Sequence, residues 1–253
     1  MKMSPMDQFA VKSIGPEWHL SHRYFTLAFT NQALWMALVV GVASIFMLAA
    51  ASNPKLVPGR LQSMAELSYE FVTNMIRQAA GDDGLIFFPF VFTIFVFVLF
   101  SNFFGLLPGA FTVTSQIAVT FALACLVFVV VIVTGFAKHG LGFLKLFVPH
   151  VPWYIIWLLV PIEVLSFFIR PLTLSVRLFA NMLAGHTMLK VFAGFVIMLG
   201  GAGGALAVLS LAPMFMIVAV SALEMLVAFL QAYVFAILTC IYLNEALHLH
   251  EQH

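Results

Sequence analysis

Long runs of apolar residues dominate the chain, and polar residues are confined to shorter segments between them. Residues 33–51 form an uncharged stretch of 19 residues, close to the about 20 residues that a helix needs to cross a bilayer. Residues 85–107 and 113–137 have the same character. We expect each of these three segments to be a membrane-spanning helix.

The segment 58–80 has a different pattern. Its apolar residues recur at helical spacing, and charged residues such as Arg60, Glu66, Glu70 and Arg77 fill the other side. This pattern predicts an amphipathic helix that lies in the plane of the membrane surface or against a partner protein.

The last part of the chain contains two longer apolar stretches, at about 153–199 and 206–245. The sequence GGAGG at 200–204 separates them, and we expect a turn there. At 1.5 Å rise per residue, the stretch from 206 to 243 would measure about 57 Å as a helix. The hydrocarbon core is only about 30 Å thick. We therefore expect two strongly tilted helices that form a hairpin.

These segments predict an all-α integral membrane protein with about five membrane-crossing helices and one membrane-plane helix. Residues 1–30 read as a polar to interfacial tail, and residues 31–253 as a single membrane domain. Composition agrees, because 63% of the residues are hydrophobic and 8% are charged, whereas soluble domains have about 25% charged residues.

Charge and cysteine content narrow the possible functions. The net charge of +1 gives no indication of nucleic-acid binding. Cys125 and Cys240 are isolated within apolar runs, which is typical of packing residues rather than of a disulfide or a metal site. We expect no cofactor and no bound metal.

The positions of lysine and arginine indicate an orientation. With the N-terminus outside and five crossings, the C-terminus is inside. The inner loops then carry Lys55, Arg60, Arg77, Lys138 and Lys145, an arrangement that the positive-inside rule favours. The outer tail also carries positive charges, at Lys2, Lys12 and Arg23, which count against this orientation. The first 30 residues contain no apolar core of a signal peptide and no transit segment, which favours a bacterial inner membrane over a mitochondrial one.

Ionisable residues within the two long helices are the strongest functional signal. Glu163, Arg170 and Arg177 are seven residues apart in turn, so they stack on one helix face. Asn181 lies one turn beyond Arg177, whereas His186 falls on the opposite face. On the second helix, Glu224 and Gln231 are again seven apart and share a face.

Charged residues at the centre of a bilayer cost about 2.5–3.5 kcal/mol and usually mark an ion pathway. Arginine stays protonated, so Arg177 can repel cations or attract a carboxylate but cannot relay protons. Glutamate and histidine can relay them. A fixed cation set apart from titratable groups predicts a divided proton path, with the anionic counterpart of Arg177 on another subunit.

Other interpretations of the same residues stay open at this point. Arg170 or Lys190 could extend its charge to the membrane surface. Glu163 could pair with Arg170 or with a lipid headgroup, and His186 could be a packing residue.

The run PLTLSVRLFANMLAG, followed by FLQAYVFAILTCIYL, resembles the a subunit of the F-type ATP synthase, the stator half of its proton channel. FVLFSNFFGLLPG and IEVLSFFIRP fit the same family. The resemblance extends over nearly the whole chain from the first span onward. It implies a non-catalytic membrane subunit that assembles with the c-subunit ring, the b subunits of the peripheral stalk and the rest of the ATP synthase.

The resemblance also implies roles for individual residues. Arg177 corresponds to the essential arginine that faces the c ring, and Asn181 and Gln231 to its polar neighbours. His186 and Glu224 correspond to a proton-relay pair in the access channel. Glu163 matches the acid of the half-channel that opens on the ATP-making side, and the helix at 58–80 matches the membrane-plane helix near the peripheral stalk.

Two alternative functions are kept. A proton-coupled secondary transporter would show internal repeats and broken helices around a substrate pocket. A structural membrane scaffold would tolerate apolar residues in place of Arg177 or Glu224.

Overall fold

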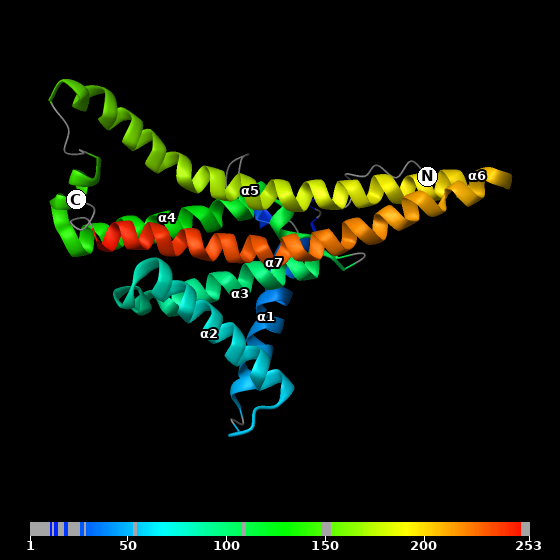
Figure 1. The fold of residues 1–253 in the computed structure, drawn as a ribbon, viewed down its shortest axis with the longest axis horizontal. Helices are drawn as coiled ribbons and strands as arrows, with labels where there is room; N and C mark the ends of the chain where they lie inside the picture. Colours follow the sequence, from blue (N-terminus) through cyan, green and yellow to red (C-terminus); the bar gives the residue numbers. More distant parts are fainter. Residues whose placement is uncertain are drawn as a thin grey trace. The chain divides into compact units, whose positions relative to one another are not determined.

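Helices make up nearly all of the regular structure (Figure 1). The computed structural model describes residues 11, 13–14, 18–19, 26–27, 29–52, 55–107, 110–147 and 153–248. Near the N-terminus, the two-residue strands β1 (Trp18–His19) and β2 (Thr26–Leu27) pair antiparallel. They lie within the tail expected at 1–30, and the other described elements are helical.

Five helices in the described residues are long and apolar enough to cross a membrane. They are α1 (Asn31–Ala51), α3 (Phe88–Gly105) with the 3₁₀ turn η2 (Asp82–Phe87) before it, α4 (Ile117–His139), α5 (Trp153–Gly201) and α7 (Leu211–Leu247). The predicted all-α class with five long apolar helices is confirmed.

The amphipathic segment forms α2 (Arg60–Ala80). Its buried side is apolar and includes Val72 and Ile76, whereas its polar residues face outward. The helix ends at Gly81, whose φ of +69° lies in the left-handed region that glycine adopts without strain. The structure agrees with the predicted amphipathic helix, whose position in the membrane plane stays a prediction.

The segment between α3 and α4 begins as a turn rather than as a spanning helix. Residues Val113–Ser115 form the 3₁₀ turn η3, and α4 begins only at Ile117. The expected span at 113–137 therefore starts four residues later. Ser115 Oγ donates to the Thr112 carbonyl oxygen at 2.6 Å, and such local hydroxyl bonds compete with the bonds of an α-helix.

The turn between the two long helices forms where the glycines predict it. Gly203 and Gly204 have φ values of +72° and +60°. A short helix α6 (Gly204–Leu209) follows, and Ser210 separates it from α7. The stretch expected at 206–245 is thus divided in two. Pro213, which has no N–H to donate, lies in the first turn of α7, where that loss is tolerated.

The chain groups into two compact units, and each contains part of α5 and part of α7. Unit 1 comprises Met1–Phe46, Phe97–Gln116 and Leu178–Ala232, and unit 2 comprises Met47–Val96, Ile117–Arg177 and Tyr233–His253. The two long helices are in contact within each unit, as the predicted hairpin requires. Their tilt in a membrane stays a prediction.

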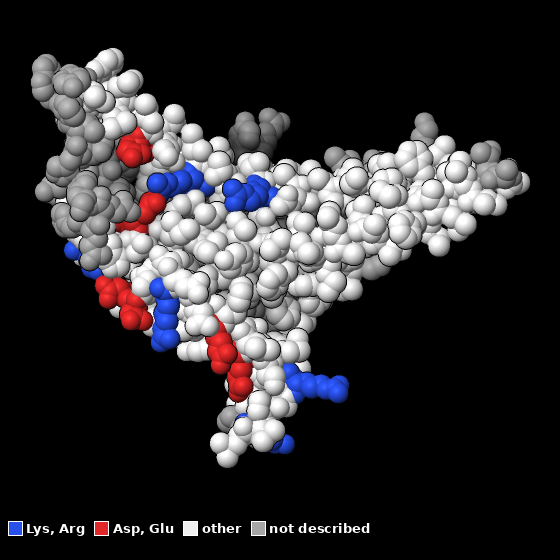
Figure 2. Space-filling model, in the orientation of Figure 1, with Lys and Arg blue, Asp and Glu red and all other residues white. Residues whose placement is uncertain are grey.

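Much of the surface of the long helices is apolar. On the face shown in Figure 2, charged side chains are few. Trp157, Ile197 and Phe215 are 75%, 71% and 74% exposed. Continuous apolar surface of this kind needs lipid or a protein partner to cover it, which agrees with a multi-pass membrane protein.

Candidate functional site

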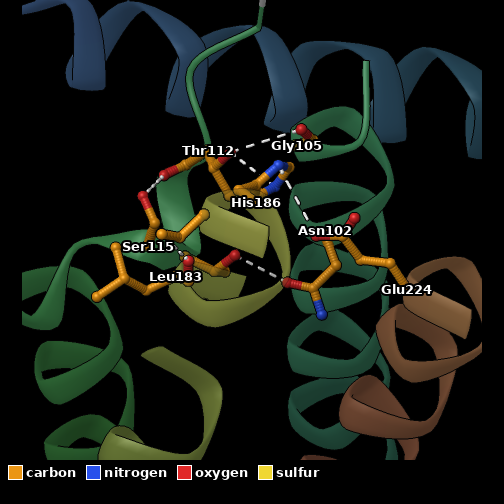
Figure 3. A network of polar contacts seen from close by, with 9 residues as sticks. Asn102, Gly105, Thr112, Ser115, Leu183, His186 and Glu224 are labelled. Carbon is orange, nitrogen blue, oxygen red and sulfur yellow. Dashed lines mark hydrogen bonds and ion pairs between the residues drawn. The ribbon is translucent and has the colours of Figure 1, made fainter. Parts of the chain in front are cut away.

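A buried histidine and a buried glutamate face each other in unit 1. Nδ1 of His186 on α5 lies 3.8 Å from Oε1 of Glu224 on α7 (Figure 3). His186 is 9% exposed and Glu224 is 4% exposed. The two atoms are within ion-pair range but farther apart than in a hydrogen bond. The structure thus brings this predicted pair together on adjoining helices.

The Glu224 carboxylate is only loosely held. Within the described part of the chain, neither of its oxygens accepts a hydrogen bond. Buried polar groups are normally satisfied, and a buried exception needs an explanation such as strain or a functional role. A carboxyl group that is free of fixed donors can gain or lose a proton without breaking a bond of the fold.

Gly185 allows α7 to approach α5 closely beside this pair. A Cβ atom at Gly185 would lie 2.4 Å from Oε1 of Glu224, far inside van der Waals contact. A larger residue at this position would displace the carboxylate from its place next to His186. The sequence analysis did not single out Gly185, although its place directly before His186 was the available signal.

The segment between α3 and α4 supplies a third side of the site. Thr112 Oγ1 lies 3.1 Å from Nε2 of His186. Thr114 Oγ1 donates to Asn102 Oδ1 at 2.9 Å, and Asn102 Nδ2 donates to the Ala228 carbonyl oxygen of α7 at 3.2 Å. These neutral polar groups surround the pair shown in Figure 3.

Asn181 and Gln231 form a second polar contact between α5 and α7 in unit 1. Asn181 Nδ2 donates to Gln231 Oε1 at 2.9 Å. Gln231 is 3% exposed, whereas Asn181 lies at the surface of the chain. The structure therefore pairs two residues that the sequence analysis placed near Arg177, and their role there stays a prediction.

Arg177 occupies an exposed position on α5, four residues before Asn181. It forms no ion pair with any other residue that the structure describes. A permanent cation on a membrane-spanning helix is expected to face a partner or a wet cavity. This exposure is compatible with an anionic counterpart outside the chain.

Arg170 pairs with a residue that the sequence analysis did not consider. In unit 2, its Nη1 donates to Oε2 of Glu245 near the end of α7. Its guanidinium also lies 5.3 Å from the centre of the Tyr242 ring and 6.0 Å from that of Phe167, within the range of cation–π contact. Arg170 thus pairs with Glu245 and not with Glu163, which was one of the alternatives for Glu163.

No metal site is formed by the described residues, in which groups of three or more histidine, cysteine or acidic residues at ligand distance are absent.

Comparison with known proteins decides the family. The profile of the family described as "ATP synthase A chain" matches residues 33–244. The chain belongs to the ATP synthase A chain family. A protein named "ATP synthase subunit a" from Mesorhizobium japonicum is 57% identical over 248 residues, which cover 98% of this chain and 97% of that protein.

Other members of the A chain family are similarly close. The "ATP synthase subunit a" of Bradyrhizobium diazoefficiens is 56% identical over 250 residues, covering 98% of this chain and 99% of the relative. That of Rhodopseudomonas palustris strain BisA53 is 55% identical over 247 residues, covering 97% and 98%. The resemblance stated from the sequence is thereby confirmed.

Membership in the A chain family confirms several expectations at once. The chain is a multi-pass, non-catalytic subunit of the membrane sector of a proton-transporting ATP synthase. The secondary-transporter alternative has no support from either the fold or the comparisons. The roles expected for Arg177, Glu163 and the other site residues remain predictions.

Three residues of the site area were missed by the sequence analysis. Thr112 lies between the spans expected at 85–107 and 113–137, and Asn102 lies near the end of the first of them. Glu245 is the last residue of the apolar stretch expected at 206–245. Hydroxyl and amide groups spaced over 102–115 were the one signal that could have pointed to the first two.

Proposed function

We propose that the chain provides two offset half-channels that load and unload protons on carboxylates of a c-subunit ring, with Arg177 between them. The observation that carries this proposal is the His186–Glu224 pair. Two groups that can exchange protons face each other at 3.8 Å, both buried, across two membrane-spanning helices. A purely structural scaffold has no need of such a pair.

Protons from the outside reach the ring through His186 and Glu224. Each side chain can take up and release a proton, and histidine does so near neutral pH. The neutral groups of Thr112, Thr114 and Asn102 line this region. A proton passed along the pair neutralises a ring carboxylate, and that c subunit can then move into contact with lipid.

Arg177 keeps the two half-channels apart. Its guanidinium is permanently charged, so it repels a free proton and attracts a deprotonated ring carboxylate. Its exposed position on α5 leaves it available to a partner subunit. The hydrogen bond between Asn181 and Gln231 supplies neutral amides next along the helix, in keeping with polar neighbours of the arginine.

After nearly a full turn of the ring, the proton leaves towards Glu163, which is partly exposed on α5. Each elementary charge that crosses a potential of 100 mV releases about 2.3 kcal/mol. Several protons are therefore needed for each ATP, and the ring acts to add their contributions.

The proposed function also implies which subunits contact the chain and which membrane contains it. The c ring faces Arg177, the b subunits of the peripheral stalk lie near α2, and lipid covers the remaining apolar surface. The N-terminus is outside and the C-terminus inside a bacterial inner membrane. The bacterial relatives support this location.

Replacement of Glu224 by glutamine tests the loading path. Glutamine keeps the shape of the side chain but cannot exchange a proton, so we expect passive proton flux through vesicles that contain the complete synthase to fall at least tenfold. The amount of assembled complex should change little. The matched control is Asp82→Asn, since Asp82 is an exposed acid at the start of the 3₁₀ turn η2, which precedes α3. Full flux with unchanged pH dependence in Glu224→Gln would contradict the proposal.

A further inference from the structure

The two ring nitrogens of His186 face groups of different chemistry. Nδ1 faces the carboxylate of Glu224 at 3.8 Å. Nε2 lies 3.1 Å from the hydroxyl oxygen of Thr112, and Figure 3 shows both contacts. A carboxylate can take up a proton and release it again, whereas a threonine hydroxyl keeps its proton. The surroundings therefore distinguish one nitrogen that can exchange a proton from one that cannot.

The Thr112 hydroxyl also faces a second acceptor. Thr112 Oγ1 lies 3.5 Å from the Gly105 carbonyl oxygen, which can only accept. A hydroxyl carries one proton and two acceptor lone pairs. When it donates to Gly105, a lone pair remains to accept from Nε2–H of His186. This arrangement leaves Nδ1 as the nitrogen that gains and loses a proton opposite Glu224.

Thr112 is held firmly in this place. It is 3% exposed, and Ser115 Oγ donates to its carbonyl oxygen at 2.6 Å. A Cβ atom at Gly105 would lie 2.7 Å from Thr112 Cγ2, so the close approach of this segment to the end of α3 requires glycine. These contacts hold the main chain of Thr112 in place and keep its methyl group close to α3.

The segment that carries Thr112 is also tied to the helix that carries Glu224. Thr114 donates to Asn102, and Asn102 donates to the carbonyl oxygen of Ala228, one turn beyond Glu224 on α7. The same network therefore fixes the groups on both sides of the His186 ring. A ring clamped in this way has one orientation relative to Glu224.

We propose that Thr112 is a positioning residue, which holds His186 in the orientation and tautomer in which Nδ1 exchanges protons with Glu224. This inference rests on the proposed function, because it requires the pair to relay protons. In the step, imidazolium donates Nε2–H to Thr112, and the proton on Nδ1 passes to the Glu224 carboxylate. The products are a neutral imidazole with Nε2–H and a protonated carboxyl group, and Thr112 keeps its own proton.

Charged groups near the ring come from two helices. Glu224 faces it from α7, and the charge of Lys190, one turn farther along α5, also acts on it. From α3 and the following segment, Gly105 and Thr112 contribute neutral groups. Substitution of Thr112 therefore changes hydrogen bonding to the ring without changing the charge around it.

The test compares Thr112→Val, which keeps the shape and removes the hydroxyl, with Thr112→Ser, which keeps the hydroxyl. Each variant is assembled in the complete synthase in vesicles, and proton-driven ATP synthesis per assembled complex is measured against the pH of the proton-loading side. Thr239→Val is the matched control, since the hydroxyl of this buried threonine bonds to the Phe235 carbonyl oxygen of its own helix.

We expect Thr112→Val to lower the rate about tenfold at neutral pH. Loss of an acceptor for Nε2–H disfavours the imidazolium, so the pH of half-maximal rate should move about one unit to the acid side, the equivalent of a tenfold change. Thr112→Ser and Thr239→Val should stay within about threefold of the unmodified chain, with the pH dependence unmoved.

An unchanged rate and pH profile in Thr112→Val would overturn the inference. So would equal losses in the valine and serine variants without a shift of the profile, because that result indicates packing. If Thr112→Val does not assemble, Thr112→Ala takes its place, and failure of both while Thr112→Ser assembles would assign the hydroxyl to assembly instead. Glu224→Gln is measured in parallel: retained flux in that variant means that the proposed function itself fails.

Discussion

α5 and α7 are linked by a contact between an acidic and a basic residue in each unit, and these two contacts differ in how tightly they are made. In unit 2, Arg170 donates directly to Glu245 and also packs against aromatic rings. In unit 1, His186 and Glu224 stay 3.8 Å apart, and the carboxylate accepts no hydrogen bond from the described residues.

The Arg170–Glu245 contact acts as an anchor between the two helices, whereas the His186–Glu224 contact is suited to the exchange of protons. A guanidinium paired with a carboxylate has a permanent charge and a strong, directional hydrogen bond, so it fixes the two helices together. Histidine and glutamate at a longer distance can each change protonation state without the loss of such a bond. We therefore expect substitutions in the His186–Glu224 contact to alter proton transfer, and substitutions in the Arg170–Glu245 contact to alter stability first.

Gly185→Ala should give the larger effect of the two substitutions that test this comparison. The added methyl group would lie 2.4 Å from Oε1 of Glu224, so the carboxylate or the whole helix face must move. We expect proton-driven ATP synthesis to fall about tenfold, which corresponds to about 1.4 kcal/mol in the barrier. The measurement is the rate per assembled complex in vesicles.

Gly194→Ala is the matched control for this substitution. Gly194 lies on the same helix, and a Cβ atom there would have no neighbour within 4 Å. Its rate should stay within about twofold of the unmodified chain, since alanine is the better helix former by about 1 kcal/mol. Equal rates in Gly185→Ala and Gly194→Ala would contradict the conclusion that the Glu224 carboxylate needs the space beside Gly185.

Glu245→Gln should give the smaller effect on transport and a clearer effect on stability. Both side chains of this ion pair are partly exposed, at 30% and 24%, so solvent screens part of the interaction. We expect about 1 kcal/mol of lost stability and a synthesis rate lowered only about twofold. Thermal release of the subunit from the detergent-solubilised synthase measures the first quantity.

The pH dependence of synthesis in Glu245→Gln distinguishes the two contacts. It should match that of the unmodified chain, because an anchor contributes no proton to the path. A shift as large as that of a substitution in the His186–Glu224 pair would show that both contacts exchange protons.

The sequence predicted the helices well. The length and continuity of apolar runs determine whether a segment can cross a bilayer, so 33–51 and 85–107 were recognisable without tertiary information. The glycine run at 200–204 likewise predicted the turn, because a left-handed φ is needed there.

Contacts between distant segments were predictable only where spacing or resemblance supplied the pairing. His186 and Glu224 were paired through the resemblance, and the structure places them together. Thr112 and Asn102 were not predicted, since neither a hydroxyl before a turn nor an amide within an apolar helix indicates which helix it will contact. The start of α4 at Ile117 was missed for a related reason, because bonds of Ser115 and Thr114 favour a turn.

The divided proton path is tested most directly by Arg177→Ala in the complete synthase, reconstituted in vesicles. Proton-driven ATP synthesis and passive decay of the proton gradient are measured on the same preparation. If Arg177 separates the two half-channels, synthesis falls to background while the gradient decays at least as fast as with the unmodified chain. Normal ATP synthesis in the Arg177→Ala vesicles would contradict the account.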